Sequence, residues 1–311
     1  MLPIAKKPTP TKPFVAVIGA ANMDLMGKMT GTAVESDSNP GEVTTSSGGV
    51  ARNIAENLAY LGTHCELVTA VGADEWGQQL LKHCESLGVG TSNTLIAEAQ
   101  RTSSYLSMHD KQGELITAIN DMAVLDCLNP SVLALRLETL QMATCWVVDA
   151  NLSEASLAYL FEHAENVPIW VDPVSTIKAR RLLPYRSKIH CITPNLQEAA
   201  ILAGFEHVTM NDAPKLAQAL HTSGVTQVMI TLGDRGAYVS DGNNAHWLDA
   251  KSSMVNNVTG CGDAAMAALV HGFVNGADWL ASGKLAMSAA ALTASSTQTN
   301  TSKLSSLGIK A

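Results

Sequence analysis

Residues 145–172 read CWVVDANLSEASLAYLFEHAENVPIWVD, which is a short apolar run, a longer segment with helical spacing and a second apolar run. Leu157, Leu160 and Phe161 recur at the spacing that places side chains on one face of a helix. The flanking runs, 145–149 and 169–172, are short and rich in β-branched and aromatic residues, as in buried strands. Because a helix joins the two strands, this unit predicts a parallel sheet.

The same alternation extends in both directions along the chain. Further strands are predicted at Val15–Gly19, Cys65–Val71, Cys191–Pro194, Gln227–Thr231 and Ala237–Ser240. Further helices are predicted at Val50–Leu61, Glu75–Leu87, Pro130–Leu137, Leu196–Ala203, Ala213–Ser223, Gly262–Asn275 and Trp279–Ser295. Strands that alternate with helices in this way favour an α/β fold whose parallel sheet is covered by helices on both faces.

Three segments depart from this alternation. Residues 23–45 are polar, and residues 102–120 alternate like a β-hairpin around a turn at 110–113. Because a hairpin does not join a parallel sheet easily, we expect these two segments to form a separate flap. Residues 293–306 are rich in Ser and Thr, and we expect a mobile terminus or a weakly ordered edge there.

Composition limits the classes of partner. The 311 residues carry 20 Lys and Arg against 28 Asp and Glu, a formal charge of −8. A general nucleic-acid binder needs a positive field, so that class is excluded, and any anion must be bound locally by loops and helix N-termini. The six cysteines form no CxxC pair and are expected to be reduced core thiols. Residues 1–13 resemble no signal peptide, and no apolar run approaches the roughly 18 residues of a membrane span, so we expect a cytoplasmic protein without membrane contact.

A run of small residues precedes one predicted helix. Residues 256–263 read Asn-Asn-Val-Thr-Gly-Cys-Gly-Asp, and an Ala-rich helical segment follows. Small residues at a helix N-terminus let backbone N–H groups approach an anion, and the helix dipole favours negative charge there. Asp263 could be an ordinary N-cap, or it could accept a proton from a hydroxyl that attacks a phosphate.

Polar residues also follow the first strand and precede the first helix. Asn22 and Asp24 come just after the strand at 15–19, where open α/β sheets bind their ligands. Gly48-Gly49 leads into the helix at 50–61 and could be a simple turn. A dinucleotide-binding Rossmann domain is excluded, because its G-x-G-x-x-G is replaced by Gly19-Ala20-Ala21-Asn22.

Four motifs in this order resemble the ribokinase-like (PfkB) carbohydrate and nucleoside kinases. They are Gly48–Asn53, Thr193–Glu198, Thr231–Gly236 and Val258–Asp263. The resemblance implies a three-layer α/β/α sandwich with a mainly parallel central sheet and a small β-sheet lid. It further implies one kinase domain over residues 14–311, a lid built from about 23–45 and 102–122, and an N-terminal extension of residues 1–13. Within the family, the segments at 37–41, 52–58, 102–107, 118–122 and 171–175 look like those of bacterial pseudouridine kinases.

The resemblance assigns roles to residues of this chain. Asp263 is implied to be the general base, with Gly260, Cys261 and Gly262 stabilising the transferred phosphoryl group. ATP is implied to contact Asn195, Thr231, Gly233, Gly236, Gly260, Gly262 and Met287. Mg²⁺ is implied at Glu198 and Asn195, largely through water. The alternative for Glu198 is a solvated charge on a helix surface. Asp172 either supports the water shell of the metal or caps a loop. K⁺ activation is left open, because Asn257 stands where the family often has the Asp on which a monovalent-cation site relies.

The substrate side follows in the same way. Asn22, Asp24, Gly48, Gly49, Asn53 and Asn151 match positions that hold the sugar, although Asn151 could equally be a turn residue. Ser103, Ser104 and Asn120 are flap candidates near the base, with purely structural hairpin roles as the alternative. The resemblance predicts ATP-dependent phosphorylation of the 5′-hydroxyl of pseudouridine. The alternatives are another nucleoside or ribose as acceptor, or an inactive nucleoside-binding protein. The exposed flap strands also predict a homodimer formed through the lid.

Overall fold

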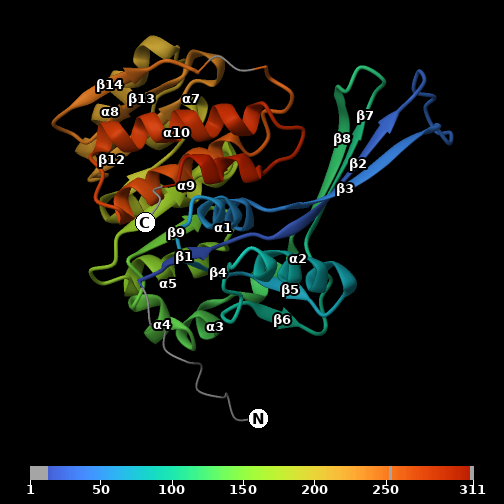
Figure 1. The fold of residues 1–311 in the computed structure, drawn as a ribbon, viewed down its shortest axis with the longest axis horizontal. Helices are drawn as coiled ribbons and strands as arrows, with labels where there is room; N and C mark the ends of the chain where they lie inside the picture. Colours follow the sequence, from blue (N-terminus) through green and yellow to red (C-terminus); the bar gives the residue numbers. More distant parts are fainter. Residues whose placement is uncertain (1–12, 252–253, 309–311) are drawn as a thin grey trace.

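A mostly parallel sheet forms the centre of the molecule (Figure 1). The computed structural model describes residues 13–251 and 254–308. In spatial order the strands are β14 (Ala245–Leu248), β13 (Ala237–Ser240), β12 (Gln227–Thr231), β11 (Cys191–Ile192), β10 (Ile169–Asp172), β9 (Cys145–Asp149), β1 (Val15–Ile18) and β4 (Cys65–Val68). The strands from β12 to β4 pair in parallel, whereas β13 and β14 add an antiparallel edge.

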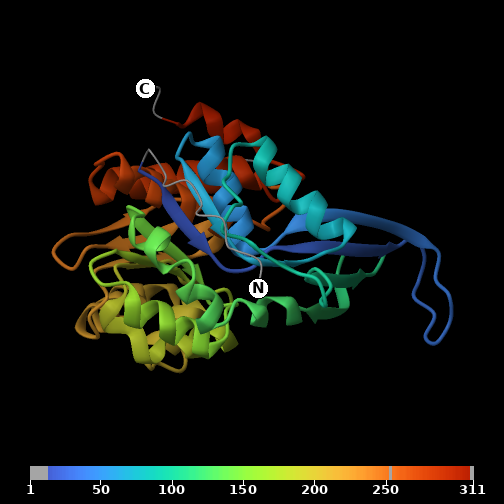
Figure 2. The ribbon, with the colours of Figure 1, turned by 90° about the horizontal axis from the view of Figure 1, so that it is seen from below.

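Helices cover both faces of this sheet, which makes three layers (Figure 2). One face packs against α1 (Val50–Tyr60), α2 (Glu75–Ser86), α9 (Cys261–Val274) and α10 (Trp279–Ala294). The other face packs against α3 (Pro130–Ala134), α4 (Leu137–Gln141), α5 (Glu154–His163), α6 (Thr176–Ala179), α7 (Leu196–Ala203) and α8 (Ala213–Thr222). The α/β/α sandwich predicted from the sequence is confirmed.

The two cores follow from the pleat of the strands. Successive side chains of a strand point to opposite faces, so a strand that is covered on both sides must be apolar throughout. In β1, Ala16 and Ile18 belong to the core under α5, whereas Val15 and Val17 belong to the core under α1 and α9. This is why the predicted strands are continuous apolar runs.

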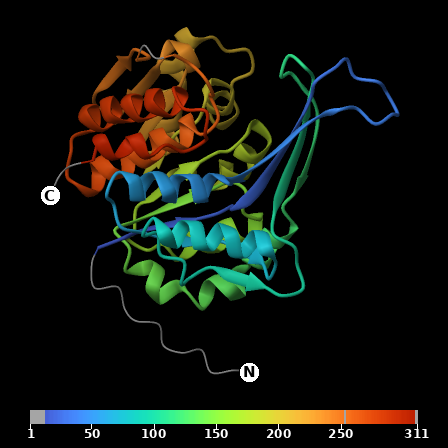
Figure 3. The same cartoon turned by 45° about the vertical axis from the view of Figure 1, so that its right-hand side comes forward.

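A second sheet projects from the body as the predicted lid (Figure 3). It consists of β3 (Gly41–Gly48), β2 (Asn22–Met29), β7 (Ser104–His109) and β8 (Leu115–Asp121), in that spatial order. β2 pairs antiparallel with β3 and parallel with β7, and β7–β8 is the hairpin expected from the sequence. A two-stranded sheet of β5 (Ala70–Gly72) and β6 (Leu95–Ala97) lies below α2 in Figure 1.

The strand register gives the lid two different faces. Asp24 of β2 pairs with Tyr105 of β7, and Tyr105 pairs with Asn120 of β8, so these three residues form one row on one face. The next row, Leu25, Leu106 and Ile119, lies on the opposite face. The first face carries the polar residues near the body, and the second exposes apolar side chains.

The C-terminal segment differs from the expectation. Residues 293–306 were expected to be mobile or weakly ordered, but Leu304 is fully buried and Asn300 is 7% exposed. A short 3-10 helix, η5 (Ser302–Ser306), packs against α1. The expectation is wrong because a Ser/Thr-rich composition does not reveal the few apolar and amide side chains that anchor the segment. Two smaller differences are the break of the predicted strand 65–71 into β4 and β5, and the strand β14, which was not predicted.

Candidate active site

Asp263 lies at the centre of the candidate site, in the first turn of α9. Its side chain is buried, with 8% of the residue exposed. The N-cap of α9 is Gly260, so Asp263 is the third residue inside the helix and the N-cap alternative is excluded. A carboxylate in this position is free to interact with a neighbouring group instead of closing the helix end.

The N-terminus of α9 is open to an anion. Gly260 adopts φ +82°, and a Cβ atom there would lie 2.3 Å from the carbonyl oxygen of Thr299, so a glycine is needed at this turn. At Gly262 a Cβ atom would meet nothing within 4 Å. The space beside Gly262 is therefore open at the positive end of the helix dipole, where an anion is favoured, while the N–H of Cys261 donates to the carbonyl oxygen of Val258 at 3.3 Å.

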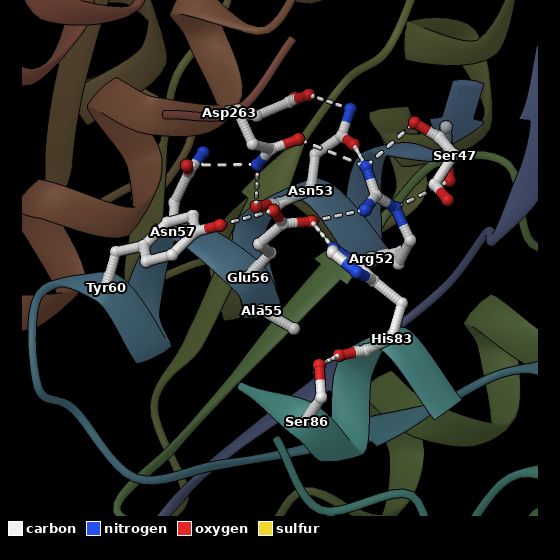
Figure 4. A network of polar contacts seen from close by, with 12 residues as sticks. Ser47, Arg52, Asn53, Ala55, Glu56, Asn57, Tyr60, His83, Ser86 and Asp263 are labelled. Atoms are coloured by element: carbon white, nitrogen blue, oxygen red, sulfur yellow. Dashed lines mark hydrogen bonds and ion pairs between the residues drawn. The ribbon is translucent and has the colours of Figure 1, made fainter. Parts of the chain in front are cut away.

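Asn53 connects the first and last motifs. Its Nδ2 donates a hydrogen bond of 2.6 Å to Oδ2 of Asp263, across 210 residues of sequence. Figure 4 shows Asn53 on α1 pointing toward Asp263 on α9. The structure thus brings the two predicted signature motifs into direct contact.

The polar residues that follow β1 lie beside this pair. Nδ2 of Asn22 donates to Oδ1 of Asp24 at 2.6 Å. A Cβ atom on Gly48 would lie 2.3 Å from Oδ2 of Asp24, and a Cβ atom on Gly49, at φ +97°, would lie 2.4 Å from the carbonyl oxygen of Ala20. The two glycines are required because the lid strand and α1 approach Asp24 and the β1 loop so closely.

Burial controls the protonation of these carboxyl groups. It raises the pKa of Asp263 to about 7, with the negative charges of Asp149 and Asp24 adding to the rise, while the hydrogen bond from Asn53 and the charge of Arg52 oppose it. Burial likewise raises the pKa of Asp24. A carboxyl group with a pKa near neutrality can accept and release a proton at physiological pH.

Asp149 accepts hydrogen bonds from three backbone N–H groups of the site, a role that was not predicted from the sequence. Its Oδ2 accepts hydrogen bonds from the N–H groups of Ala20 and Ala51, and its Oδ1 accepts one from Asn151. A Cβ atom on Gly19 would lie 2.3 Å from this carboxylate. The available signal was a lone Asp at the end of an apolar strand, but its partners lie in distant segments.

Asn195 and Glu198 begin α7 as a capping box. Oδ1 of Asn195 accepts from the N–H of Glu198 at 2.9 Å, and Oε2 of Glu198 accepts from the N–H of Asn195 at 2.9 Å. Glu198 is 6% exposed, so it is not a solvated helix charge. Asp172, at the end of β10, is also buried, and its pKa lies well above its ordinary range because of burial and the nearby charges of Asp263, Glu198 and Asp149. A row of buried carboxyl groups thus runs from Asp263 to Glu198.

A cleft beside α7 has a volume of about 460 Å³, and its lining includes Asn195, Thr231 and Gly233. These are three of the residues expected to contact a nucleotide. Gly236 adopts φ +90°, and a Cβ atom there would lie 1.9 Å from the carbonyl oxygen of Leu248. A glycine is therefore needed where this loop packs against Leu248. Thr176 and Met210 also line the cleft and were missed, since neither belongs to a recognised motif.

Other predicted residues lie away from the cleft or on the opposite face of the lid. Met287 is 7% exposed and packs in the core under α9 and α10, away from the lining of that cleft. Ser104 pairs with Met23, so the pleat puts it on the opposite lid face from Asp24, and buried Ser103 accepts a backbone hydrogen bond from Met23. Oδ1 of Asn151 accepts from Nζ of Lys178.

The site suits Mg²⁺ bound mainly through water and phosphate. Within residues 13–251 and 254–308, no group of three or more His, Cys, Asp or Glu side chains is arranged to hold a metal ion. Mg²⁺ ordinarily binds through one or two carboxylates, several waters and the phosphates of a nucleotide. Glu198, buried one residue beyond the cleft lining and close enough for its charge to raise the pKa of Asp172, fits this mode of binding.

Over the same described part of the chain, no helix has both the length and the apolar character needed to span a bilayer.

Comparisons with known proteins agree with this geometry. Residues 12–306 match the model of the pfkB family of carbohydrate kinases. The chain is 38% identical over 295 residues to the pseudouridine kinase of Escherichia coli K12, covering 94% of each chain, and 27% identical over 263 residues to the guanosine-inosine kinase of Exiguobacterium acetylicum, covering 82% and 86%. The structure of Arabidopsis thaliana ribokinase complexed with ribose and ATP superimposes with a TM-score of 0.83 at 20% identity, covering 96% and 99%. The chain therefore belongs to the pfkB family and is a phosphotransferase that acts on a sugar or nucleoside hydroxyl.

Proposed function

We propose that this protein transfers the γ-phosphoryl group of ATP to the 5′-hydroxyl of pseudouridine. The observation that carries the proposal is the convergence of Asp24, Asn53 and Asp263 at the open N-terminus of α9. The choice of pseudouridine rests on the 38% identity to the Escherichia coli enzyme over 94% of both chains. In this proposal residues 14–311 act as one kinase domain, and the sheet of β2, β3, β7 and β8 closes over the acceptor.

Asp263 is the general base of the proposed reaction. Its carboxylate takes the proton of the 5′-hydroxyl as the oxygen bonds to the γ-phosphorus, and the bond from that phosphorus to the bridging oxygen of ADP breaks. The N–H groups of Gly260, Cys261 and Gly262 stabilise the charge on the transferred group. A raised pKa suits Asp263 to this exchange, because it leaves the group only weakly acidic near neutral pH.

The sugar is held by carboxylate and amide groups. Asp24 accepts hydrogen bonds from the ribose hydroxyls, while Asn22 and Asn53 both donate and accept. Asn151, at the end of β9, is a further sugar contact in this proposal. Gly48 and Gly49 leave the space in which these side chains meet.

The lid row supports a nucleoside over free ribose as acceptor. Tyr105 and Asn120 stand in register beside Asp24, on the face that carries the sugar-binding carboxylate. An aromatic ring next to the sugar site can pack on a nucleobase, and an amide can form hydrogen bonds with the ring N–H and carbonyl groups of a uracil. Free ribose would leave both side chains without a partner.

ATP and Mg²⁺ are assigned to the neighbouring cleft. Thr231 and Gly233 line it, and Gly236 fixes the loop that faces the phosphates. Mg²⁺, held by Glu198 and Asn195 through water, would neutralise phosphate charge during transfer.

A panel of acceptors tests the proposal. Purified protein with ATP and Mg²⁺ is given pseudouridine, uridine, guanosine, inosine and ribose in turn, and ADP release and product mass are followed. The expected result is the highest kcat/KM for pseudouridine, with a 5′-monophosphate as product. A higher kcat/KM for guanosine or ribose would replace the substrate assignment but keep the kinase chemistry.

We also propose a homodimer formed through the outer face of the lid. Val43, Leu106, Met108 and Ile119 are 39–73% exposed, and the register puts them all on the face opposite Asp24. A patch of large apolar side chains favours burial against a second copy. Light scattering at micromolar concentration should give twice the chain mass, and Ile119→Lys should give the monomer; a monomeric parent protein would refute the dimer.

A further inference from the structure

Arg52 is a charged side chain buried next to the candidate base. It lies in the first turn of α1, is 2% exposed, and directly precedes Asn53. Its Nε donates to the carbonyl oxygen of Gly48 at 3.0 Å, and its Nη2 donates to that of Ser47 at 3.0 Å. Burying a guanidinium is unfavourable unless its donors and its charge are satisfied, so the surrounding acceptors are an essential part of the fold.

Three side chains complete the set of acceptors around Arg52, as Figure 4 shows in part. Nη1 forms an ion pair with Oε2 of Glu56, one turn along the helix. Nη2 donates to Oδ1 of Asn53 and, at 3.0 Å, to Oδ1 of Asn300. Asn300 belongs to the C-terminal segment, 248 residues away in sequence from Arg52.

These contacts orient the amide of Asn53. Because its Oδ1 accepts from Arg52, its Nδ2 must face the other way, and there it donates to Asp263. Asn300 supports the same turn from behind, since its Nδ2 donates to the backbone oxygen of Asn53 at 2.9 Å and to Oδ1 of Asn57 at 3.0 Å. A chain of hydrogen bonds therefore runs from Asn300 and Arg52 through Asn53 to Asp263.

Arg52 is also a cation that acts on the carboxyl groups of the site, where Lys178 interacts with Asp149 as well. The charged groups that face Asp263 are Asp24 of β2, Asp149 of β9, Asp172 of β10 and Arg52 of α1. Besides burial, the charges of Asp149 and Asp24 disfavour ionisation of Asp263, and the charge of Arg52 opposes them at Asp263 and counters the rise that burial causes in the pKa of Asp24.

The opposite side of Arg52 faces Glu56 and its partners. Oε1 of Glu56 accepts from the hydroxyl of Tyr60 at 3.1 Å, and Nε2 of His83 lies 3.3 Å from Oε2. The thiol of Cys84, on α2, also lies within the field of this ion pair. Glu56 therefore offsets part of the charge that Arg52 presents to Asp263.

We propose that Arg52 is a positioning residue for phosphoryl transfer: it orients Asn53 and thereby keeps the Asp263 carboxylate in place and ionised, with Glu56 and Asn300 as its anchors. The inference rests on the proposed role of Asp263 as the base. It gives the C-terminal segment a part in catalysis through Asn300, although that segment contributes no reacting group.

The test separates orientation from charge by comparing kcat and the acid limb of kcat/KM against pH. Arg52→Met removes both, so kcat should fall about tenfold or more and the acid limb should move up by about one pH unit, the lower end of a neighbouring charge's effect. Arg52→Lys keeps the charge but not the fork of donors, so kcat should fall while the limb stays near its parental position. Glu56→Gln leaves Arg52 unopposed, so the limb should move to lower pH.

Controls make each outcome decisive. Arg180→Gln removes an exposed guanidinium and should change neither quantity. His83→Gln removes the imidazole from the network and should leave the limb in place; a shifted limb would mean that His83, not Asp263, sets it, and would overturn the inference. Circular dichroism and thermal unfolding report whether each variant folds.

The inference fails if Arg52→Met keeps both the parental limb and kcat within about twofold, or if Arg52→Met and Glu56→Gln shift the limb in the same direction. If Arg52→Met does not fold, Arg52→Lys and Glu56→Gln test the inference without it. An acid limb of kcat/KM that does not move to lower pH in Glu56→Gln overturns the effect of charge. An unchanged kcat in Arg52→Lys overturns the effect of orientation. Asp263→Asn distinguishes a failure of the proposed function from a failure of this inference, because full activity of that variant would refute Asp263 as the proposed base. An inactive Asp263→Asn with unaltered Arg52 variants would refute this inference only.

Discussion

Gly48→Ala tests the geometry of the sugar site with a single methyl group. An added Cβ would lie 2.3 Å from Oδ2 and 2.6 Å from Cγ of Asp24, whereas ordinary Cβ contacts begin near 3.4 Å. The carboxylate must therefore retreat by about 1 Å, which exceeds the tolerance of a hydrogen bond. If Asp24 holds the ribose hydroxyls, at least one hydrogen bond to a charged acceptor is lost.

The expected loss is about 1.5–3 kcal/mol of binding free energy, because hydrogen bonds to charged groups contribute on that scale. The Kd for pseudouridine should thus rise about 10- to 100-fold, at roughly tenfold per 1.4 kcal/mol. Isothermal titration calorimetry without ATP measures this Kd directly, and thermal unfolding reports whether the variant folds.

Gly31→Ala is the matched control in the same lid. A Cβ atom there would meet nothing within 4 Å, so binding should be unchanged. A folded Gly48→Ala protein that binds pseudouridine within about twofold of the parent would refute the placement of Asp24 in the sugar site.

Three further predictions concern ionisation and metal binding. Because only ionised Asp263 accepts a proton and burial raises its pKa to about 7, kcat/KM should fall about tenfold per pH unit below pH 7; a profile flat down to pH 5 would contradict this. The pKa of Asp263 in the folded protein lies above that in the unfolded chain, so ionisation of this buried carboxyl group lowers the free energy of unfolding increasingly from about pH 4 to pH 7. Asp263→Asn removes this cost, so calorimetry should show a higher Tm for the variant, with a larger increase at pH 8 than at pH 5. Glu198→Gln should raise the Mg²⁺ concentration for half-maximal rate about tenfold or more, whereas the exposed control Glu154→Gln should not; equal Mg²⁺ curves would remove Glu198 from the metal site.

The sheet and its helices could be predicted because burial on both faces leaves a direct signal. Runs such as 145–148 and 169–171 must be apolar throughout, and the helical segment between them must carry one apolar face. β14 lacked this signal, since three of its four residues are exposed at the antiparallel edge. The break between β4 and β5 falls at Thr69, inside an apolar run with no turn residue to mark it.

The candidate site was predictable where its residues lie within recognisable motifs. Asn53 and Asp263 were expected to serve one site, and a hydrogen bond joins them. The roles of Asp149, Arg52 and Asn300 could not be predicted, because each depends on partners from distant parts of the chain. Asn300 is the clearest case: it lies in a polar segment without periodicity, and only packing against α1 makes it part of the site.

The most direct test of the account is phosphoryl transfer to pseudouridine by the parent protein and by Asp263→Asn. Product is followed by ³¹P NMR and mass spectrometry, with ATP and Mg²⁺ in excess. The account predicts pseudouridine 5′-phosphate from the parent, and a rate lower by about 10²–10⁴-fold from the folded variant, as for loss of a general base. An Asp263→Asn protein that phosphorylates pseudouridine at the parental rate, or a parent that leaves pseudouridine unchanged, would contradict it.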